Sequence, residues 1–93
     1  MKYFMMRPCK TTAAYFATLR KSLTLDLEES RRTLEERGCR ITDCGVLLII
    51  HDDPERTLYR SGRILVKTAE EEVARRAVES IYDALGVVQK LAV

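Results

Sequence analysis

The fold is decided by Thr57-Leu-Tyr-Arg-Ser-Gly-Arg-Ile-Leu-Val-Lys-Thr68, a segment in which two strand-like runs flank the dipeptide Ser61-Gly62. Two such runs joined by a two-residue turn that contains glycine are typical of a β-hairpin. The second run leads directly into Thr68, the predicted N-cap of the last helix, and Glu71 completes a capping box. The segment therefore predicts two antiparallel strands followed by a helix.

Periodicity and turn residues on either side predict the remaining elements. The sequence favours a strand over residues 12–19, a helix over 27–37, a short strand within 39–43, an apolar strand over 46–50 and a turn over 51–55. Asp26 and Gly38 are the predicted N-cap and C′ residue of the first helix, and Gly86 is predicted to end the second. The apolar face of the second helix is predicted to consist of Val73, Ala74, Ala77, Val78, Ile81 and Leu85.

This order, β-α-β-β-β-β-α, predicts one α+β domain over residues 1–93, with a curved antiparallel sheet and both helices on one face. An N-terminal arm of residues 1–11 and a C-terminal tail of residues 87–93 are expected to flank it. The alternative is a ferredoxin-like βαββαβ domain. In that fold residues 57–68 form one long strand and residues 87–93 form a closing fourth strand.

The composition indicates an ordinary soluble domain. The 93 residues are 46% hydrophobic and 32% charged, and no apolar run approaches the ~20 residues that cross a bilayer. Residues 1–6 are too short an apolar stretch for a secretory signal. The three cysteines form no close-set framework and fit a reducing compartment. We therefore expect a cytoplasmic protein that does not contact membranes.

Strand alternation predicts one sheet face without helix cover. Ile64 and Val66 are expected to pack on the helices, as are Val46, Leu48 and Ile50. The opposite face is predicted to contain Leu47, Ile49, Tyr59, Ser61, Arg63, Leu65 and Lys67. An exposed apolar patch of this kind usually marks a partner surface. In the alternative, the N-terminal arm or residues 87–93 fold over it.

Charge is distributed unevenly along the chain. Residues 1–24 contain five basic side chains and no acidic one, and residues 54–68 contain four basic side chains and one acidic side chain. Both predicted helices have an acidic balance. We expect an acidic helix side and a basic sheet side. The alternative is that the acidic runs are simply solvated helix faces.

Several short motifs together resemble one repeat of the TATA-box-binding protein family. They are Leu25-Asp26-Leu27, the glycine and apolar strand of residues 45–50, Asp53-Pro54, residues 58–63 and the acidic start of the last helix. The resemblance covers residues 12–86. It implies a sheet that forms half of a saddle, and since the family protein has two repeats, it implies a homodimer here.

The resemblance also suggests which residues would contact nucleic acid. Tyr59 stands where the second of two kinking phenylalanines is expected, and Ser61, Arg63 and Lys67 would then face phosphate. The first phenylalanine has no counterpart, because Asp43 and Cys44 occupy that neighbourhood. An inserted apolar side chain is what opens a base step, so the sequence does not predict a paired aromatic wedge.

Catalytic and metal-binding motifs are scarce. His51 is the single histidine and has no serine or cysteine partner at a recognisable spacing, so we do not expect an enzyme. A zinc set of Cys9, Cys39, Cys44 and His51 is the alternative to cysteines that act as small hydrophobic residues. Asp43, Asp52 and Asp53 are expected in solvated turns rather than around a cation. We expect no metal or other cofactor.

Two functions follow as hypotheses. The first is a non-catalytic interaction module that self-associates, or docks a protein partner, through the open sheet face. The second is a nucleic-acid-binding module that acts as a homodimer of TATA-box-binding-protein-like halves through the basic sheet side. Self-association and heparin retention at rising salt distinguish them.

Overall fold

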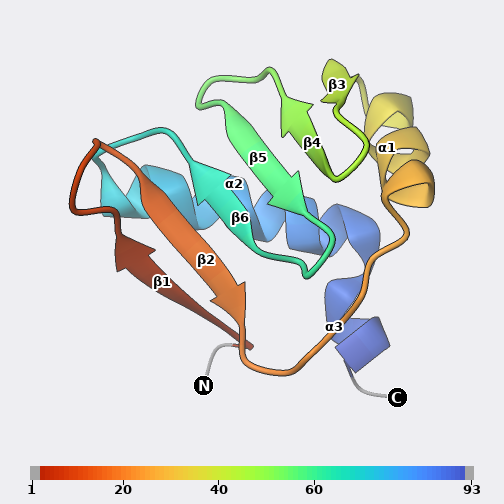
Figure 1. Ribbon diagram of the computed structural model, residues 1–93, viewed down its shortest axis with the longest axis horizontal. Coiled ribbons are helices and arrows are strands. Elements are labelled where there is room, and N and C mark those ends of the chain that lie inside the picture. Colours follow the sequence, from red (N-terminus) through yellow and green to blue (C-terminus); the bar gives the residue numbers. More distant parts are fainter. Residues whose placement is uncertain (1–2, 92–93) are drawn as a thin grey trace.

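The computed structural model describes residues 3–91, which form one six-stranded antiparallel sheet and three helices (Figure 1). The elements are β1 (Phe4–Pro8), β2 (Tyr15–Leu19), α1 (Leu27–Glu36), β3 (Ile41–Asp43), β4 (Leu47–Ile50), β5 (Arg56–Tyr59), β6 (Ile64–Val66), α2 (Glu71–Leu85) and α3 (Val87–Leu91). The strands lie in the order β1-β2-β6-β5-β4-β3. The predicted α+β class and the antiparallel open sheet are confirmed.

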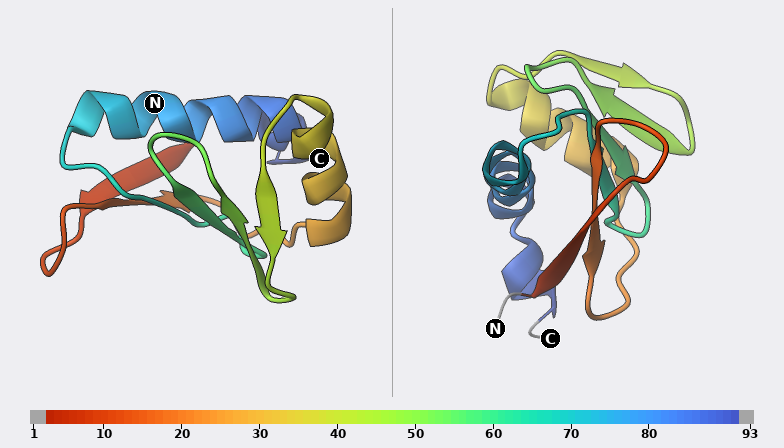
Figure 2. Two further views of the ribbon diagram at one scale, coloured as in Figure 1. Left: turned by 90° about the horizontal axis from the view of Figure 1, so that it is seen from above. Right: turned by 90° about the vertical axis from the view of Figure 1, so that its left-hand side faces the viewer.

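All three helices lie on one side of the sheet (Figure 2). The long helix α2 crosses behind the strands, and α1 lies beside β3 and β4 (Figure 1). Figure 2 shows no helix on the opposite side of the sheet. The molecule therefore has two layers, with one sheet face packed on helices and the other without helix cover.

The core lies between α2 and alternate residues of the strands. Leu48, Ile50, Leu58, Ile64 and Val66 are fully buried on the helix side, as strand alternation predicts for four of them. The buried residues of α2 are Ala74, Ala77, Val78, Ile81, Tyr82 and Leu85. The predicted stripe is thus confirmed except that Val73 is only partly buried and Tyr82 is fully buried.

The turn at Ser61-Gly62 joins β5 and β6 as an antiparallel pair. The Tyr59 amide donates to the Arg63 carbonyl at 2.9 Å, which closes the turn, and Gly62 has a φ of 86°. A continuous strand over residues 57–68 is therefore wrong. Residues 87–91 form helix α3 rather than a strand, so the ferredoxin-like alternative is wrong as well; residues 92–93 lie outside the described range.

The sequence predicts an N-terminal arm over residues 1–11. This is wrong for residues 4–8, which form strand β1 and pair with β2, while residues 1–2 lie outside the described range. Without β1, strand β2 would be an edge strand with a row of unpaired backbone groups. Strand β2 starts at Tyr15 rather than at residue 12, because residues 9–14 form the loop between β1 and β2. The loop is closed by a hydrogen bond from the Cys9 amide to the Ala14 carbonyl at 2.8 Å.

The two long helices begin differently. The Asp26 side chain accepts hydrogen bonds from the amides of Glu28 and Glu29 at 3.1 Å, which confirms it as the N-cap of α1. The prediction for α2 is wrong, since its N-cap is Glu70, whose side chain makes no capping bond. Thr68 lies before the helix and accepts a hydrogen bond from the Glu70 amide at 3.2 Å.

Val46 also differs from its predicted position. It lies in the turn between β3 and β4, before the first paired residue of β4, and its exposed fraction is 69%. The Cys44 amide donates to the Leu47 carbonyl at 3.0 Å, which makes Gly45 and Val46 the two central residues of this turn. The Val46 side chain therefore does not contribute to the core.

Candidate functional site: the open sheet face

Strand register shows which side chains share the face without helices, here called the open face. One row runs across the whole sheet in the order Thr42, Ile49, Thr57, Leu65, Phe16 and Arg7. Leu47 and Tyr59 form a neighbouring pair, as do Thr18 and Met5. Arg63 and Lys67 flank β6 on the same side by alternation with Leu65. None of the strand residues on this face is acidic, and Glu55, just before β5, pairs with Lys67.

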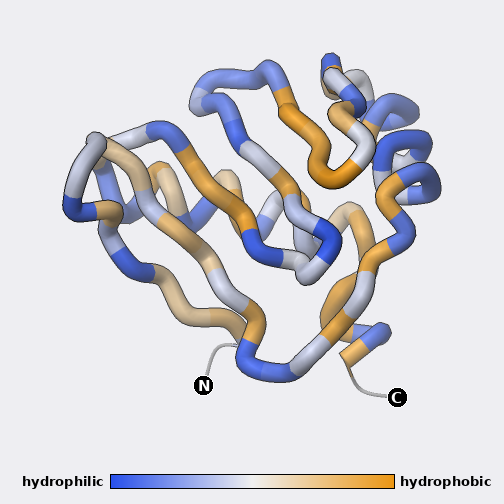
Figure 3. Tube along the Cα trace, viewed as in Figure 1, coloured by the Kyte–Doolittle hydropathy of each residue, from blue (hydrophilic) through white to orange (hydrophobic). Residues whose placement is uncertain are grey.

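One half of the open face is apolar. We define the apolar patch as Leu47, Ile49, Tyr59 and Leu65, all partly exposed, around the nearly buried Thr57. Cross-strand pairs connect its members, since Leu47 lies opposite Tyr59 and Thr57 lies opposite both Ile49 and Leu65. Figure 3 shows β4 as a continuous hydrophobic strand at this end of the sheet.

Neither chain end covers the apolar patch within residues 3–91. Strand β1 extends the sheet at the edge next to β2, so it lies beside the face rather than over it. Helix α3 lies on the helix side, where Val87 is buried in the core and Leu91 packs against it (Figure 2). The predicted alternative of a covered face is thus wrong for the residues that the structure describes.

The other half of the open face is basic and aromatic. The Arg63 guanidinium lies over the Phe16 ring with its carbon 4.0 Å from the ring centroid. A hollow of about 570 Å³ beside this pair is lined by Met5, Arg7, Pro8, Cys9, Lys10, Thr11, Phe16, Thr18 and Arg63. We call it the basic hollow, because it contains three cationic side chains and no acidic one.

The positive charge of Lys67 is compensated by a neighbouring carboxylate, that of Glu55. Its Nζ lies 2.8 Å from a carboxylate oxygen of Glu55. The hydrogen bond from Lys67 lowers the pKa of Glu55 below its usual value, so the carboxylate stays ionised and the pair stays charged. Lys67 therefore offers less free positive charge on the open face than Arg63, which has no carboxylate partner among the described residues.

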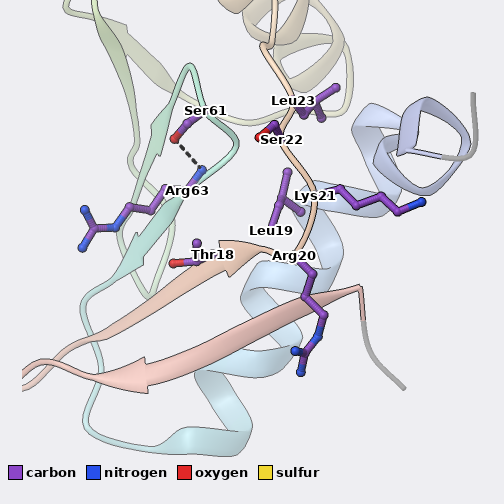
Figure 4. Close-up of a pocket in the computed structure, with 8 residues that line it drawn as sticks. All are labelled: Thr18, Leu19, Arg20, Lys21, Ser22, Leu23, Ser61 and Arg63. Atoms are coloured by element: carbon purple, nitrogen blue, oxygen red, sulfur yellow. Dashed lines mark hydrogen bonds between the residues drawn. The ribbon is translucent and has the colours of Figure 1, made fainter.

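A second hollow, of about 280 Å³, lies between the end of β2 and the turn of residues 59–63 (Figure 4). It is lined by Arg20, Lys21 and Arg63 among others, and Ser61 accepts a hydrogen bond from the Arg63 amide at 3.4 Å. Figure 4 shows that the long cationic side chains diverge, with Arg63 on one side of the sheet and Lys21 directed toward the helices. Their charges do not converge on one ligand position.

The structure does not bring the three cysteines and His51 together. Cys9 follows β1 at one edge of the sheet, whereas Cys39 and Cys44 flank β3 at the opposite edge. His51 Nε2 is 2.6 Å from Thr42 Oγ1. Within residues 3–91 no three side chains of His, Cys, Asp or Glu are placed to hold a metal ion. The predicted alternative of a zinc set is therefore wrong.

Cys9 differs chemically from the other two cysteines. Hydrogen bonds from the Thr11 side chain and the Thr11 and Thr12 backbone lower the pKa of Cys9 to about 7. Burial raises the pKa of Cys39 instead. At neutral pH the Cys9 thiolate is therefore substantially populated at the rim of the basic hollow.

Comparison with known proteins adds no family to these observations. No family model matches the chain, and neither a curated protein nor a solved structure matches it. Over the described range, none of the helices combines the length and the apolar character needed to cross a membrane.

Sequence reasoning missed six residues of the open face, namely Met5, Arg7, Phe16, Thr18, Thr42 and Thr57. The sequence predicts an arm over residues 1–11, so alternation does not place Met5 and Arg7 on a face. Phe16 carried a usable signal, because in the strand Tyr15–Leu19 it alternates with the buried Ala17 and Leu19. The predicted residues Leu47, Ile49, Tyr59, Arg63 and Leu65 do lie together on the open face, and Ser61 is exposed in the adjoining turn.

Proposed function

We propose that this protein is a non-catalytic interaction module that pairs with a second copy of itself through the apolar patch. The observation that carries the proposal is the partial exposure of Leu47, Ile49 and Leu65 on a sheet face that no described segment covers. Contiguous apolar surface on a soluble protein usually marks an interface. Burial of this surface supplies a driving force that needs no charged partner.

A second copy is favoured as the occupant because the patch is free of formal charge. Two copies related by a two-fold axis bring the same surface together, so a charge close to the axis would face its own kind. The patch offers only leucine, isoleucine, threonine and tyrosine side chains. The net charge of +2 also gives little overall repulsion between copies.

The finer fold assignment, one half of a TATA-box-binding-protein-like saddle, belongs to this proposal. It is supported by the element order from β2 to α2, which is β-α-β-β-β-β-α, and by the turn at Ser61-Gly62. Strand β1 and helix α3 lie outside that pattern. A saddle of two halves is also a homodimer, but it leaves the concave sheet face free, whereas the proposed pairing covers the apolar patch on that face.

Sedimentation tests the proposal directly. We expect wild type to form dimers at high micromolar concentration, and Leu65→Glu and Leu47→Glu to be monomeric because each inserts a charge into the apolar interface. The matched control is Val88→Glu, which puts the same charge on a residue of α3 with an exposed fraction of 45%. A monomeric wild type, or equal dissociation by Val88→Glu, would contradict the proposal.

A further inference from the structure

We infer that the basic hollow binds single-stranded nucleic acid, with the Phe16–Arg63 pair as a platform for a base and with the charges of Arg7, Lys10 and Arg63 facing its phosphates. This inference goes beyond self-association, because it concerns the other half of the open face and another class of partner. The hollow is bounded by β1, the loop of residues 9–14, β2 and Arg63, whereas the apolar patch lies on β4, β5 and β6.

The positive charge of the basic hollow favours an anionic ligand. Arg7, Lys10 and Arg63 line the hollow together, and no acidic side chain lines it. The acidic residues of the chain concentrate on the helices, for example Glu71 and Glu72 at the start of α2. In the described residues no carboxylate lies within ion-pair distance of these three cations, so a bound phosphate would gain their full attraction.

The aromatic platform selects a nucleobase over a simple anion. The Arg63 guanidinium lies over the Phe16 ring, with its carbon 4.0 Å from the ring centroid. Bases stack on aromatic rings and on guanidinium planes, which is how sheet surfaces commonly bind unpaired nucleotides. The hollow volume of about 570 Å³ is ample for one base with its sugar.

The shape of the site favours a single strand over a duplex. Only unpaired and unstacked bases present a free face to a protein ring, because in a duplex each face is covered by its neighbours. The Phe16–Arg63 platform lies on the open face, and no helix on that side of the sheet could enter a major groove (Figure 2). An acidic peptide would satisfy the cations but would gain little from the platform.

Fluorescence anisotropy with a labelled 12-nucleotide oligo(dT) or oligo(U) is the test. We expect Kd values of roughly 1–100 µM at low salt, and a slope of log K against log salt of about −2, as three cations predict for a single strand. A DNA hairpin duplex of the same length and a poly-glutamate peptide should bind at least about tenfold more weakly, since neither stacks on the platform.

Variants assign the binding to the hollow. Arg63→Glu should weaken oligonucleotide binding at least about tenfold and make the salt slope less negative by about one, as expected for loss of a phosphate contact. Phe16→Leu should weaken it by about five- to 100-fold with the slope unchanged, the loss expected for one stacked base. Arg76→Glu, the matched charge change on the outer side of α2, should have little effect.

A chemical footprint provides a second measurement. Cys9 lines the hollow, whereas the exposed Cys44 lies at the far edge of the sheet. Saturating oligonucleotide should slow alkylation of Cys9 by iodoacetamide severalfold and leave Cys44 unchanged. The inference fails if wild type does not bind, if duplex or poly-glutamate binds equally well, if Arg76→Glu weakens binding as much as Arg63→Glu, or if both cysteines are slowed equally.

The two proposals fail separately. Leu47→Glu changes the apolar patch and should abolish dimers while oligonucleotide binding per chain persists. Arg63→Glu should weaken oligonucleotide binding while dimers persist. Loss of both properties in both variants would show that one undivided surface serves a single partner, which would overturn the assignment of nucleic acid to the basic hollow.

Discussion

The two faces of the sheet use the same strands for different purposes. In β6, Ile64 and Val66 are fully buried against the helices, while Leu65 between them stays partly exposed on the open face. In β4, Leu48 and Ile50 are buried and Leu47 and Ile49 are not. The residue types hardly differ, so hydrophobicity alone does not decide which face forms the core.

The difference lies in what covers each face. Helix α2 presents six buried residues to one face, and no described segment lies over the other. The helix face should therefore determine folding stability, and the open face should determine association. Substitutions that separate these two quantities test this division, and the following predictions run from the largest expected effect to the smallest.

Removal of core volume from the helix face should have the largest effect. Ile81→Ala should lower the free energy of unfolding by about 2–5 kcal/mol, because the side chain is nearly fully buried and leaves a cavity. Ile49→Ala, on the open face, should cost less than about 1.5 kcal/mol because its side chain is partly exposed in the folded monomer. Urea denaturation at low protein concentration measures both, and equal costs would contradict the division.

Substitution of Gly62, in the turn between β5 and β6, should have the next largest effect on stability. Gly62→Ala should cost about 2–4 kcal/mol, since φ is +86° and an added Cβ would lie 2.4 Å from Leu19 Cδ1 in the core. Gly38→Ala is the matched control, with a φ of +92° and no atom within 4 Å of the added Cβ. It should cost only about 1–2 kcal/mol, the backbone contribution. Similar melting temperatures for the two variants would show that the contact with Leu19 is harmless.

The Tyr82 hydroxyl ties α2 to the same turn. It donates to the Gly62 carbonyl at 2.5 Å, and burial raises the pKa of Tyr82 above its usual value. Tyr82→Phe should cost about 1–3 kcal/mol, because the Gly62 carbonyl loses its buried partner. Thermal unfolding measures the loss, and it should appear without any change in oligomeric state. A fully stable variant would mean that another donor or water replaces the hydroxyl.

The helix caps should show the smallest effects and the clearest contrast. Asp26→Ala should cost about 1 kcal/mol, because its carboxylate accepts from two amides of α1. Thr68→Ala should cost less than about 0.5 kcal/mol, since Thr68 is outside α2 and its hydroxyl lies in exposed surroundings. Circular dichroism melts compare them, and a larger loss for Thr68→Ala would restore it as the functional cap.

The sequence predicted most of this layout because local rules determine it. Alternation placed Leu65 between Ile64 and Val66, and the Ser61-Gly62 turn fixed the pairing of β5 with β6. The α1 cap at Asp26 followed from the residue type and from Glu29 three residues later. The candidate site residues Leu47, Ile49, Tyr59 and Arg63 could be assigned to one face by the same rule.

Long-range partners were beyond local rules. Strand β1 pairs with β2 across a loop, and nothing within Phe4–Pro8 shows that an edge needs covering. Arg56 is buried on the helix side, where it pairs with the nearby Asp52 and donates to the Ala77 carbonyl at 3.0 Å, a partner that only the fold brings near. The Phe16–Arg63 contact joins β2 to the residue before β6 and was missed for the same reason.

The central claim is that the open face, and not the helix face, is the interaction surface. Methyl NMR spectra over a dilution series from high to low micromolar concentration test it most directly, because both faces contain leucine, isoleucine or valine. Methyl shifts of Leu47, Ile49 and Leu65 should move with concentration, while those of Ile64, Val66 and the exposed Val88 should stay constant. Constant shifts for all of these residues, or concentration-dependent shifts centred on Val88, would contradict the claim.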